Sequence, residues 1–357
     1  MSLFAAFDRK QIITLAVAVI ATIAAGFMDL THGNEVLAFI TAAVALAALA
    51  ATVGEATEHL GGHLSAGATG VLQSAIGNLP ELFVSIFALR AGLVTVVQSS
   101  IVGSVLANSL LVLGLAFVLG SRRHGVLKFD SIPPRMIATL TMLAVSALVI
   151  PTLAFELHLP AGGHEDALGI FTAIILIVVF VASVPSIVKG GPEAVPAEAH
   201  VKARHWPLAL TIGVLVVAGI GAAFVSEWFV AALEPTMDAL NISEAFAGLV
   251  IVAIAGNAVE NVVGVQLALR NKADLAVSVV LNSSLQVLLV LTPALVLLSW
   301  FVAGSVFTLV MPPLLVVALF LGALLGAVIV FDGHADGVEG VALVGLYAII
   351  AAAFWWG

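Results

Sequence analysis

Two glutamates stand out as residues that could carry chemistry, because each lies inside a long apolar stretch and ends the same short motif. One motif reads GNLPE from Gly77 to Glu81, and the other reads GNAVE from Gly256 to Glu260. A carboxylate at the centre of a membrane helix costs about 2.5 to 3.5 kcal/mol on insertion scales, so such residues are usually functional. A single one can instead be protonated or join two helices. Two at a constant offset of 179 residues, in a chain of 357, favour a functional pair within two half-copies.

The residue types of the motif point to an oxygen-lined site. Its amide and carboxylate are three residues apart, which puts them on one face of a helix. Pro80 removes a backbone donor, and Gly77 and Gly256 tolerate irregular dihedral angles, so we expect locally broken helices with free carbonyl oxygens. The signal for a break is weaker at Gly256, where no proline follows. Irregular backbone at this depth is tolerated where it lines a cavity.

A second group of polar residues follows each motif in the next apolar stretch. Ser104 and Asn108 share a helical face in the first half, and Ser283 and Gln286 share one in the second. Ser104 and Ser283 also keep the offset of 179 residues. Serines in membrane helices are often packing residues, whereas the two amides are better candidates for lining a site.

An all-oxygen set of carboxylates, amides, hydroxyls and carbonyls suits Ca²⁺, Mg²⁺, Mn²⁺ or Na⁺ rather than softer metals. Two carboxylates in a low-dielectric site become neutral with either one divalent cation or two protons. A carrier that crosses the membrane only when neutral would therefore exchange these two loads.

Two further acidic pairs are weaker candidates for an access path. Thr57 and Glu58 end one apolar stretch, and Ser226 and Glu227 lie near the end of another. We expect Glu58 and Glu227 to line the mouths of the path to the ion, although ordinary interfacial residues would show the same pattern.

The composition is that of an integral membrane protein that lies almost wholly within the bilayer. Apolar residues make up 62% of the chain and charged residues 9%, against about 25% charged in ordinary soluble domains. Eleven stretches are long enough to span a membrane. They lie near residues 11–28, 35–58, 69–90, 96–120, 135–156, 166–188, 207–232, 244–270, 273–300, 307–331 and 338–356.

The basic residues predict the orientation of these spans. With the N-terminus in the cytoplasm, eleven of the twelve Lys and Arg residues fall on the cytoplasmic side and Arg90 alone falls outside. The C-terminus is then outside. Eleven spans divide into one N-terminal helix (1–33) and two five-helix repeats (34–188 and 207–357), joined by a cytoplasmic linker (189–206). Because five is odd, the second repeat enters the membrane from the opposite side.

The predicted fold is therefore an all-α membrane protein with two inverted-topology repeats, the common plan of secondary transporters that work by alternating access. We expect a prokaryotic inner (plasma) membrane as its location, with a eukaryotic vacuolar membrane as the alternative and the lipid bilayer as surroundings. We expect no cofactor, no nucleic-acid partner and no enzymatic activity. The chain has no cysteine, which excludes disulfides and thiolate metal sites. A homo-oligomer stays open.

The motifs resemble the two signature repeats of the calcium/proton exchangers of the cation/calcium antiporter superfamily. The resemblance covers nearly the whole chain and rests on residues 77–82 with 84–92 in the first half. In the second half it rests on residues 256–260, 271–276 and 282–286.

This resemblance implies exchange of Ca²⁺ for H⁺, with Glu81 and Glu260 as the shared carriers of ion and protons. It also implies which residues line the metal site: Asn78, Asn257, Ser104, Asn108, Ser283 and Gln286. Related sodium/calcium exchangers usually carry an aspartate in the helix after the second motif. The amide of Gln286 in that neighbourhood fits proton coupling.

Other readings of the sequence remain open. The nearest alternative is an exchanger that couples to Na⁺ or that prefers Mn²⁺ or another divalent cation. A membrane-embedded hydrolase is disfavoured because the chain lacks paired aspartates, Ser/His sets and His-Glu metal motifs. A channel would share the polar residues, but inverted repeats favour alternating access.

Overall fold

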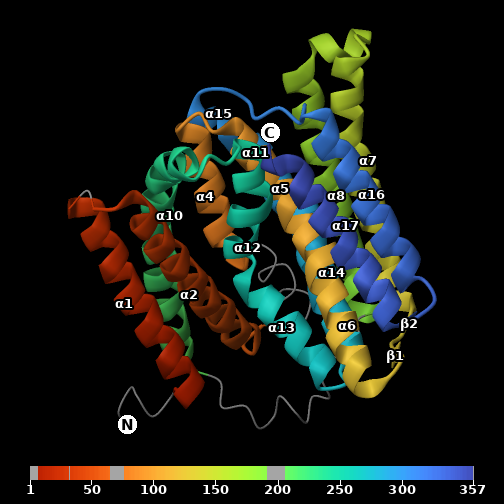
Figure 1. Ribbon diagram of the computed structural model, residues 1–357, viewed down its shortest axis with the longest axis horizontal. Helices are drawn as coiled ribbons and strands as arrows, with labels where there is room; N and C mark the ends of the chain where they lie inside the picture. The colour runs from red at the N-terminus through yellow and green to blue at the C-terminus, as the bar shows by residue number, and fades with distance from the viewer. Residues whose placement is uncertain (1–6, 32, 65–75, 191–205, 357) are drawn as a thin grey trace. The chain divides into compact units, whose positions relative to one another are not determined.

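The computed structural model describes residues 7–31, 33–64, 76–190 and 206–356. The described chain is almost entirely helical, with two strands of two residues each (Figure 1). It divides into two compact units, each built from two separate stretches. The first unit holds Met1–Ala91 and Glu193–Asn241, and the second holds Gly92–Pro192 and Ile242–Gly357. Each unit thus combines parts of both expected repeats, whose boundaries stay a prediction.

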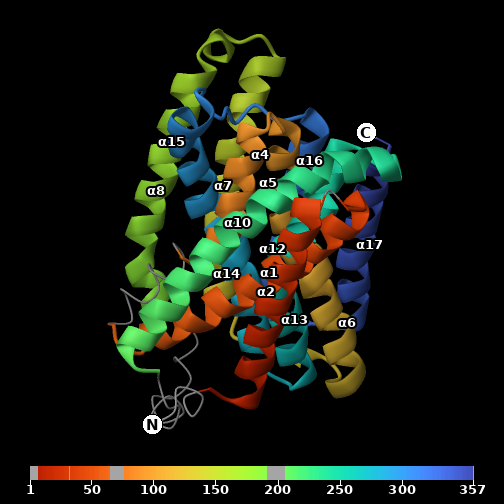
Figure 2. The ribbon, with the colours of Figure 1, turned by 90° about the vertical axis from the view of Figure 1, so that its left-hand side faces the viewer.

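The first unit is organised around α2, which packs against both α1 and α10 (Figures 1 and 2). Its helices in the described residues are α1 (Arg9–Thr31), α2 (Glu35–Gly61), α4 (Leu79–Arg90) and α10 (Leu208–Leu240). The side chain of Asn34 caps α2 by accepting a hydrogen bond from the Leu37 amide. Buried alanines such as Ala42 and Ala45 let neighbouring backbones approach closely.

The second unit begins with three membrane-length segments. The first changes from α-helix to π-helix and back, and the third follows a short 3₁₀ turn. The elements are α5 (Val94–Leu106), η2 (Ala107–Val112), α6 (Leu113–His124), β1 (Leu127–Lys128), α7 (Ile132–Glu156), η3 (Pro160–Gly163) and α8 (Glu165–Gly190).

The remainder of the second unit includes two more segments that pass through π-helical turns. Its elements are α11 (Glu244–Phe246), η4 (Ala247–Val252), α12 (Ala253–Gly256), α13 (Ala258–Leu269), α14 (Ala273–Gln286), η5 (Val287–Leu291), α15 (Thr292–Ala303), α16 (Pro313–Val330), β2 (His334–Ala335) and α17 (Gly337–Trp355).

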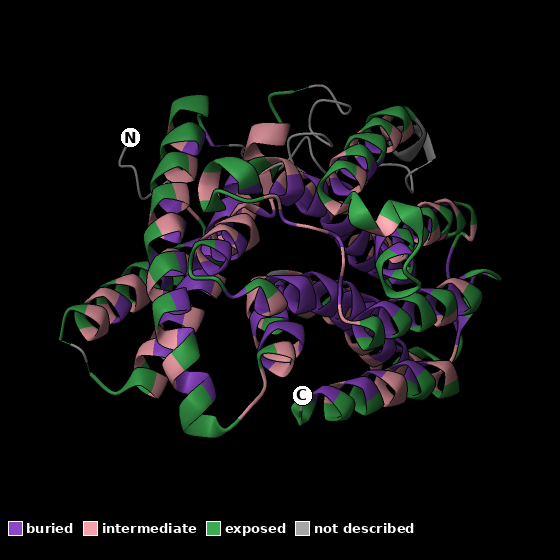
Figure 3. Ribbon diagram, turned by 90° about the horizontal axis from the view of Figure 1, so that it is seen from above, coloured by how far each residue is buried: buried purple, intermediate pink, exposed green. Residues whose placement is uncertain are grey.

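The core of the second unit lies along α5. Every residue from Val96 to Leu106 is buried, polar ones included. Figure 3 shows the buried, intermediate and exposed residues of the described helices. α5 crosses η4 at two glycines. A Cβ at Gly103 would clash with the backbone of Leu249, and one at Gly248 would clash with Ser99. Only glycine lets the two backbones come this close.

Nine helices of the described residues are long and apolar enough to cross a membrane, or ten if the bent pair 244–269 counts as one span. They match ten of the eleven expected stretches in position. The remaining expected span, 69–90, lies partly outside the described residues, which hold α4 as its second part. The total of eleven therefore stays a prediction.

Several connections of the second unit meet at one end of its helices. β1 pairs with β2 in an antiparallel manner, with Leu127 opposite Ala335. The backbone amide of Asp130 donates to the carboxylate of Asp274 at 2.7 Å. These contacts join the connections that follow α6, α13 and α16.

Two other contacts of the second unit join the end of α7 to the segment before α16, and the segment before α11 to the end of α17. The hydroxyl of Thr152, near the end of α7, accepts from the amide of Met311 at 3.0 Å, just before α16. The hydroxyl of Ser243, just before α11, donates to the carbonyl of Phe354 in α17 at 2.6 Å.

In the first unit, similar contacts join helix ends. A ring nitrogen of His63, just after α2, lies 3.1 Å from the carbonyl oxygen of Trp206, just before α10. The hydroxyl of Thr236, near the end of α10, donates to the carbonyl of Glu35 at the start of α2 at 3.4 Å. α2 and α10 therefore run antiparallel, with residues 63 and 206 at the same end of the unit.

Candidate ion site

The helix that carries Glu260 breaks at Asn257. α12 ends at Gly256, α13 begins at Ala258, and Asn257 between them has φ −96° and ψ 21°. The segments on the two sides of the break, Glu244–Gly256 and Glu260–Leu269, differ in direction by 63°. The break that the sequence indicated only weakly here is thus present without a proline.

The side chain of Asn257 is the centre of a buried hydrogen-bond cluster. Its Nδ2 donates to Ser104 Oγ at 2.9 Å and to the carbonyl oxygen of Ala253 at 2.9 Å. Its Oδ1 accepts from Asn108 Nδ2 at 3.0 Å and from Ser283 Oγ at 3.4 Å. Asn108 Nδ2 also donates to Ser283 Oγ at 3.0 Å. The structure thereby brings together four of the residues expected to line the site.

Two features of this cluster were not expected. π-Helical turns begin at Ala107 and at Val287, directly beside the polar residues of both helices, and such turns are frequent at functional sites. A second pair, Ser109 and Ser284, is in hydrogen-bond contact at 3.1 Å. Hydrophobic spacing carries no signal for the single inserted residue of a π-helical turn. The contact between the two serines depends on how their helices pack, which the sequence does not show.

The remaining polar residues of this unit lie close along the chain to the cluster. Glu260 is half-buried in the first turn of α13, three residues after Asn257, and Gln286 is the half-buried last residue of α14. Asn261, next to Glu260, was missed. Its buried Oδ1 accepts no hydrogen bond from the described residues. An amide beside an intramembrane acid would have been the signal for it.

The first unit repeats the local geometry of the motif. Asn78 has φ −95° and ψ 16° and directly precedes α4, and Pro80 lies in the first turn of that helix. Asn78 is buried and Glu81 is half-buried. Glu81 belongs to the first unit and Glu260 to the second, so the meeting of the two carboxylates stays a prediction.

The two residues expected along the access path are both exposed. Glu58 lies in the last turn of α2, whereas Glu227 lies well inside α10. Their exposure is compatible with a path or with an ordinary surface, and their role stays a prediction.

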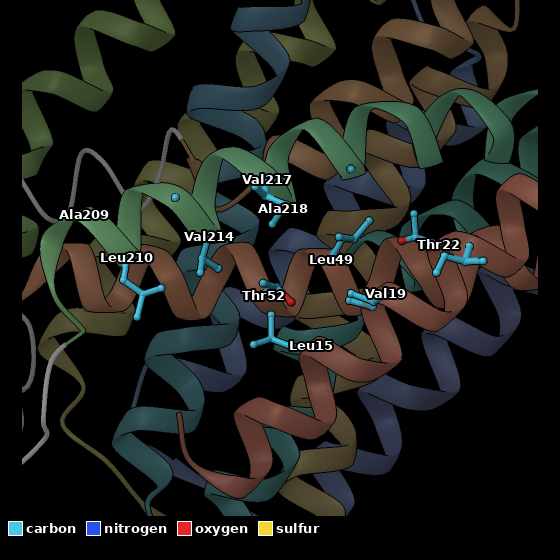
Figure 4. A pocket seen from close by; sticks show the side chains of 14 residues that line it. Leu15, Val19, Thr22, Leu49, Thr52, Ala209, Leu210, Val214, Val217 and Ala218 are labelled. Atoms are coloured by element: carbon cyan, nitrogen blue, oxygen red, sulfur yellow. The ribbon is translucent and has the colours of Figure 1, made fainter. Parts of the chain in front are cut away.

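A cavity of about 490 Å³ in the first unit has a different character. It lies among α1, α2 and α10 and is lined by apolar residues such as Leu15, Leu49 and Val214, with Thr22 and Thr52 as its hydroxyls (Figure 4). It contains no charged or amide side chain. The lining therefore offers neither the carboxylates nor the amide oxygens that usually bind a hard metal ion.

The chemistry available in the described residues is that of oxygen ligands. No group of three or more His, Cys, Asp or Glu side chains is placed to hold a metal within the described ranges. The polar groups that surround Asn257, three residues before Glu260, are amides, hydroxyls and the backbone of a broken helix. A membrane-length helix that breaks at an acid–amide motif and carries buried polar groups is typical of membrane proteins that transport ions.

The chain belongs to the sodium/calcium exchanger protein family, whose model matches residues 34–187 and 210–356. It is 32% identical over 346 residues to the Ca(2+)/H(+) antiporter of Synechocystis sp., covering 90% of this chain and 91% of that protein. It is 33% identical over 342 residues to the Ca(2+)/H(+) antiporter of Aphanothece halophytica, with the same coverage.

Among solved structures, the chain is similar to native YfkE, with a TM-score of 0.81 and 31% identity. The match covers 96% of this chain and 99% of that one. The resemblance to the calcium/proton exchangers that the two motifs indicated is thereby confirmed.

Proposed function

We propose that this protein exchanges Ca²⁺ for H⁺ across a membrane by alternating access, with Glu81 and Glu260 binding either Ca²⁺ or protons. Its relatives named as Ca(2+)/H(+) antiporters match over 90% of the chain, which supports this exchange. The observation that carries the site is the helix break at Asn257, whose side chain binds buried amides and hydroxyls three residues before the half-buried Glu260.

The mechanism follows from charge balance at two carboxylates. A pair of ionised glutamates in a low-dielectric site is costly, and one Ca²⁺ or two protons would neutralise it. Ca²⁺ takes six to eight oxygen ligands, more than two carboxylates supply. We propose that further polar residues line the site and that some of them supply the remaining oxygens: Asn78, Asn257, Ser104, Asn108, Ser283 and Gln286. Glu58 and Glu227 would attract cations to the path.

An inverted pair of five-helix repeats is the proposed architecture. The two separate matches of the family model, residues 34–187 and 210–356, support two repeats. The proposed total of eleven spans is supported by parity. His63 after α2 and Trp206 before α10 lie at the same end of the first unit, which requires an even number of crossings between them. The described chain has three membrane-length segments in this interval, so the stretch 69–90 would be the fourth.

The contacts between connections support the same sidedness. Connections expected in the cytoplasm join one another through β1, β2, Asp130 and Asp274. Connections expected outside join one another through Thr152 with Met311 and through Ser243 with Phe354. The excess of basic residues supports a cytoplasmic location for the first group. We propose a prokaryotic inner membrane as the location of the protein.

Transport in sealed proteoliposomes tests this function. With an outward-directed proton gradient and no Na⁺ present, we expect ⁴⁵Ca²⁺ uptake that stops when a protonophore dissipates the gradient. Uptake that required Na⁺ would contradict proton coupling. Unlabelled Mn²⁺ in excess measures selectivity. If unlabelled Mn²⁺ inhibits ⁴⁵Ca²⁺ uptake much more strongly than the same concentration of unlabelled Ca²⁺, the protein is an Mn²⁺ exchanger instead.

A further inference from the structure

We infer that Asn257 is a positioning residue of the transport reaction rather than a ligand of the ion. This inference rests on the proposed function, since it assigns a role within the same site. It refines the expectation that Asn257 contributes an oxygen ligand.

The orientation of the Asn257 amide follows from one partner. The carbonyl oxygen of Ala253 can only accept a hydrogen bond, so the atom that lies 2.9 Å from it must be Nδ2. Oδ1 then faces Asn108 and Ser283, as the described hydrogen bonds require.

Every hydrogen-bonding position of this amide is in use. A primary amide has two N–H donors and two acceptor lone pairs. The donors serve Ser104 and Ala253, and the lone pairs accept from Asn108 and Ser283. Asn257 is only 1% exposed. A cation would have to displace a buried partner to reach Oδ1.

The same bonds explain what the side chain does. Asn257 interrupts the helix, and its backbone amide and its Nδ2 both donate to the carbonyl oxygen of Ala253, at 3.1 and 2.9 Å. The side chain is thereby fixed to the last turn before the break. Its other bonds attach the break to α5 through Ser104, to η2 through Asn108 and to α14 through Ser283. Glu260 lies three residues later, so its position depends on the direction in which α13 leaves this anchor.

Asn108 provides a contrast within the cluster. It is fully buried, and its Oδ1 accepts no hydrogen bond from the described residues, although its Nδ2 donates twice. The cluster thus has an amide oxygen that is free for an ion, and it does not belong to Asn257.

Replacement of Asn257 by Asp, Ser and Ala separates the two roles. Asn257→Asp keeps the shape and the acceptor oxygen but removes both donors. Asn257→Ser keeps a hydroxyl that can donate to the carbonyl four residues earlier. We expect turnover per folded molecule, measured as ⁴⁵Ca²⁺ uptake, to fall at least about tenfold for both Asp and Ala. The serine variant should lie between these and the wild type.

The alternatives predict different orders. If Asn257 were a ligand, the aspartate variant would retain or lower the KM for Ca²⁺, because a carboxylate is a better ligand for this ion. That result would overturn the inference. Unchanged turnover per folded molecule in all three variants, with only a lower yield, would also overturn it by reducing Asn257 to a structural residue.

Thermal stability in EGTA provides a second measurement. If Asn257 positions the site, its replacement should lower the Tm of the Ca²⁺-free protein. Ser104→Ala should lower this Tm as well. If Asn257→Asp does not insert, the serine and alanine variants decide, and an unchanged Ca²⁺-free Tm for both would overturn the inference. If the protein did not couple Ca²⁺ to protons, the wild type itself would show no gradient-driven uptake. This result is distinguishable from failure of the present proposal, which appears only when variants are compared with an active wild type.

Discussion

Asn78 and Asn257 adopt the same backbone conformation, with φ −95° and ψ 16° in one and φ −96° and ψ 21° in the other. Both dihedral pairs lie in the sparsely populated bridge region, where many active-site residues are found. Pro80 follows the first asparagine by two residues, whereas Val259 occupies the matching place in the second repeat. The break is therefore a property of the shared Gly-Asn pair and not of the proline.

This relationship predicts that Pro80→Ala is tolerated. Proline in the first turn of a helix lacks an N–H that has no intrahelical partner there anyway. We expect ⁴⁵Ca²⁺ uptake by Pro80→Ala to fall by less than about fivefold, which corresponds to an effect of about 1 kcal/mol. Loss of uptake as complete as that caused by replacing the neighbouring glutamate would show that proline does maintain the first break.

The crossing of α5 and η4 predicts two glycines that cannot be replaced. Gly103→Ala and Gly248→Ala would each place a methyl group into the backbone or side chain of the facing segment, with an expected destabilisation of about 1–3 kcal/mol. A thermal unfolding assay in detergent should show a lowered Tm for both. Gly345→Ala in α17 is the matched control, because nothing lies within 4 Å of its Cβ position. Equal Tm values for Gly103→Ala and this control would contradict the close crossing.

The eleven-span topology predicts opposite sides for the two ends of the stretch 65–90. The absence of native cysteine allows single cysteines at Leu64 and Ala91, both exposed positions. A membrane-impermeant maleimide added to intact cells should label Ala91→Cys, and it should label Leu64→Cys only after permeabilisation. Labelling of both from the same side would show that the stretch 65–90 does not cross the membrane, and it would contradict the inverted repeat.

Glu58 and Glu227 should have smaller effects than the proposed carriers. Because both side chains are exposed, their charges would raise the local cation concentration without binding the ion tightly. We expect Glu58→Gln and Glu227→Gln to raise the KM for Ca²⁺ a few-fold at low ionic strength and less at high salt. An unchanged KM at low salt for both would place them outside the access path.

The sequence predicted the helical membrane fold and the positions of the polar residues better than the contacts between them. The apolar stretches match the observed helices because a helix must be about 20 apolar residues long to cross the bilayer. That Ser104 and Asn108 share one helical face follows from helical spacing. That both bind Asn257 depends on how α5 crosses the broken helix, which glycines such as Gly103 and Gly248 allow.

The contacts of the Asn257 side chain show why its residue type alone did not predict its role. Its amide suggested an ion ligand, but whether a buried amide binds an ion or the protein is decided by its neighbours in three dimensions. The π-helical turns at Ala107 and Val287 are likewise products of tertiary packing that a pattern of apolar residues does not record.

The most direct test of the central claim is ⁴⁵Ca²⁺ uptake driven by a proton gradient in proteoliposomes containing wild type, Glu81→Gln or Glu260→Gln at equal amounts of folded protein. Glutamine keeps the shape of the side chain but can neither ionise nor carry a proton. The account predicts uptake by the wild type and none above background for either variant, with normal membrane insertion of all three. Near-normal, gradient-dependent uptake by either variant would contradict it.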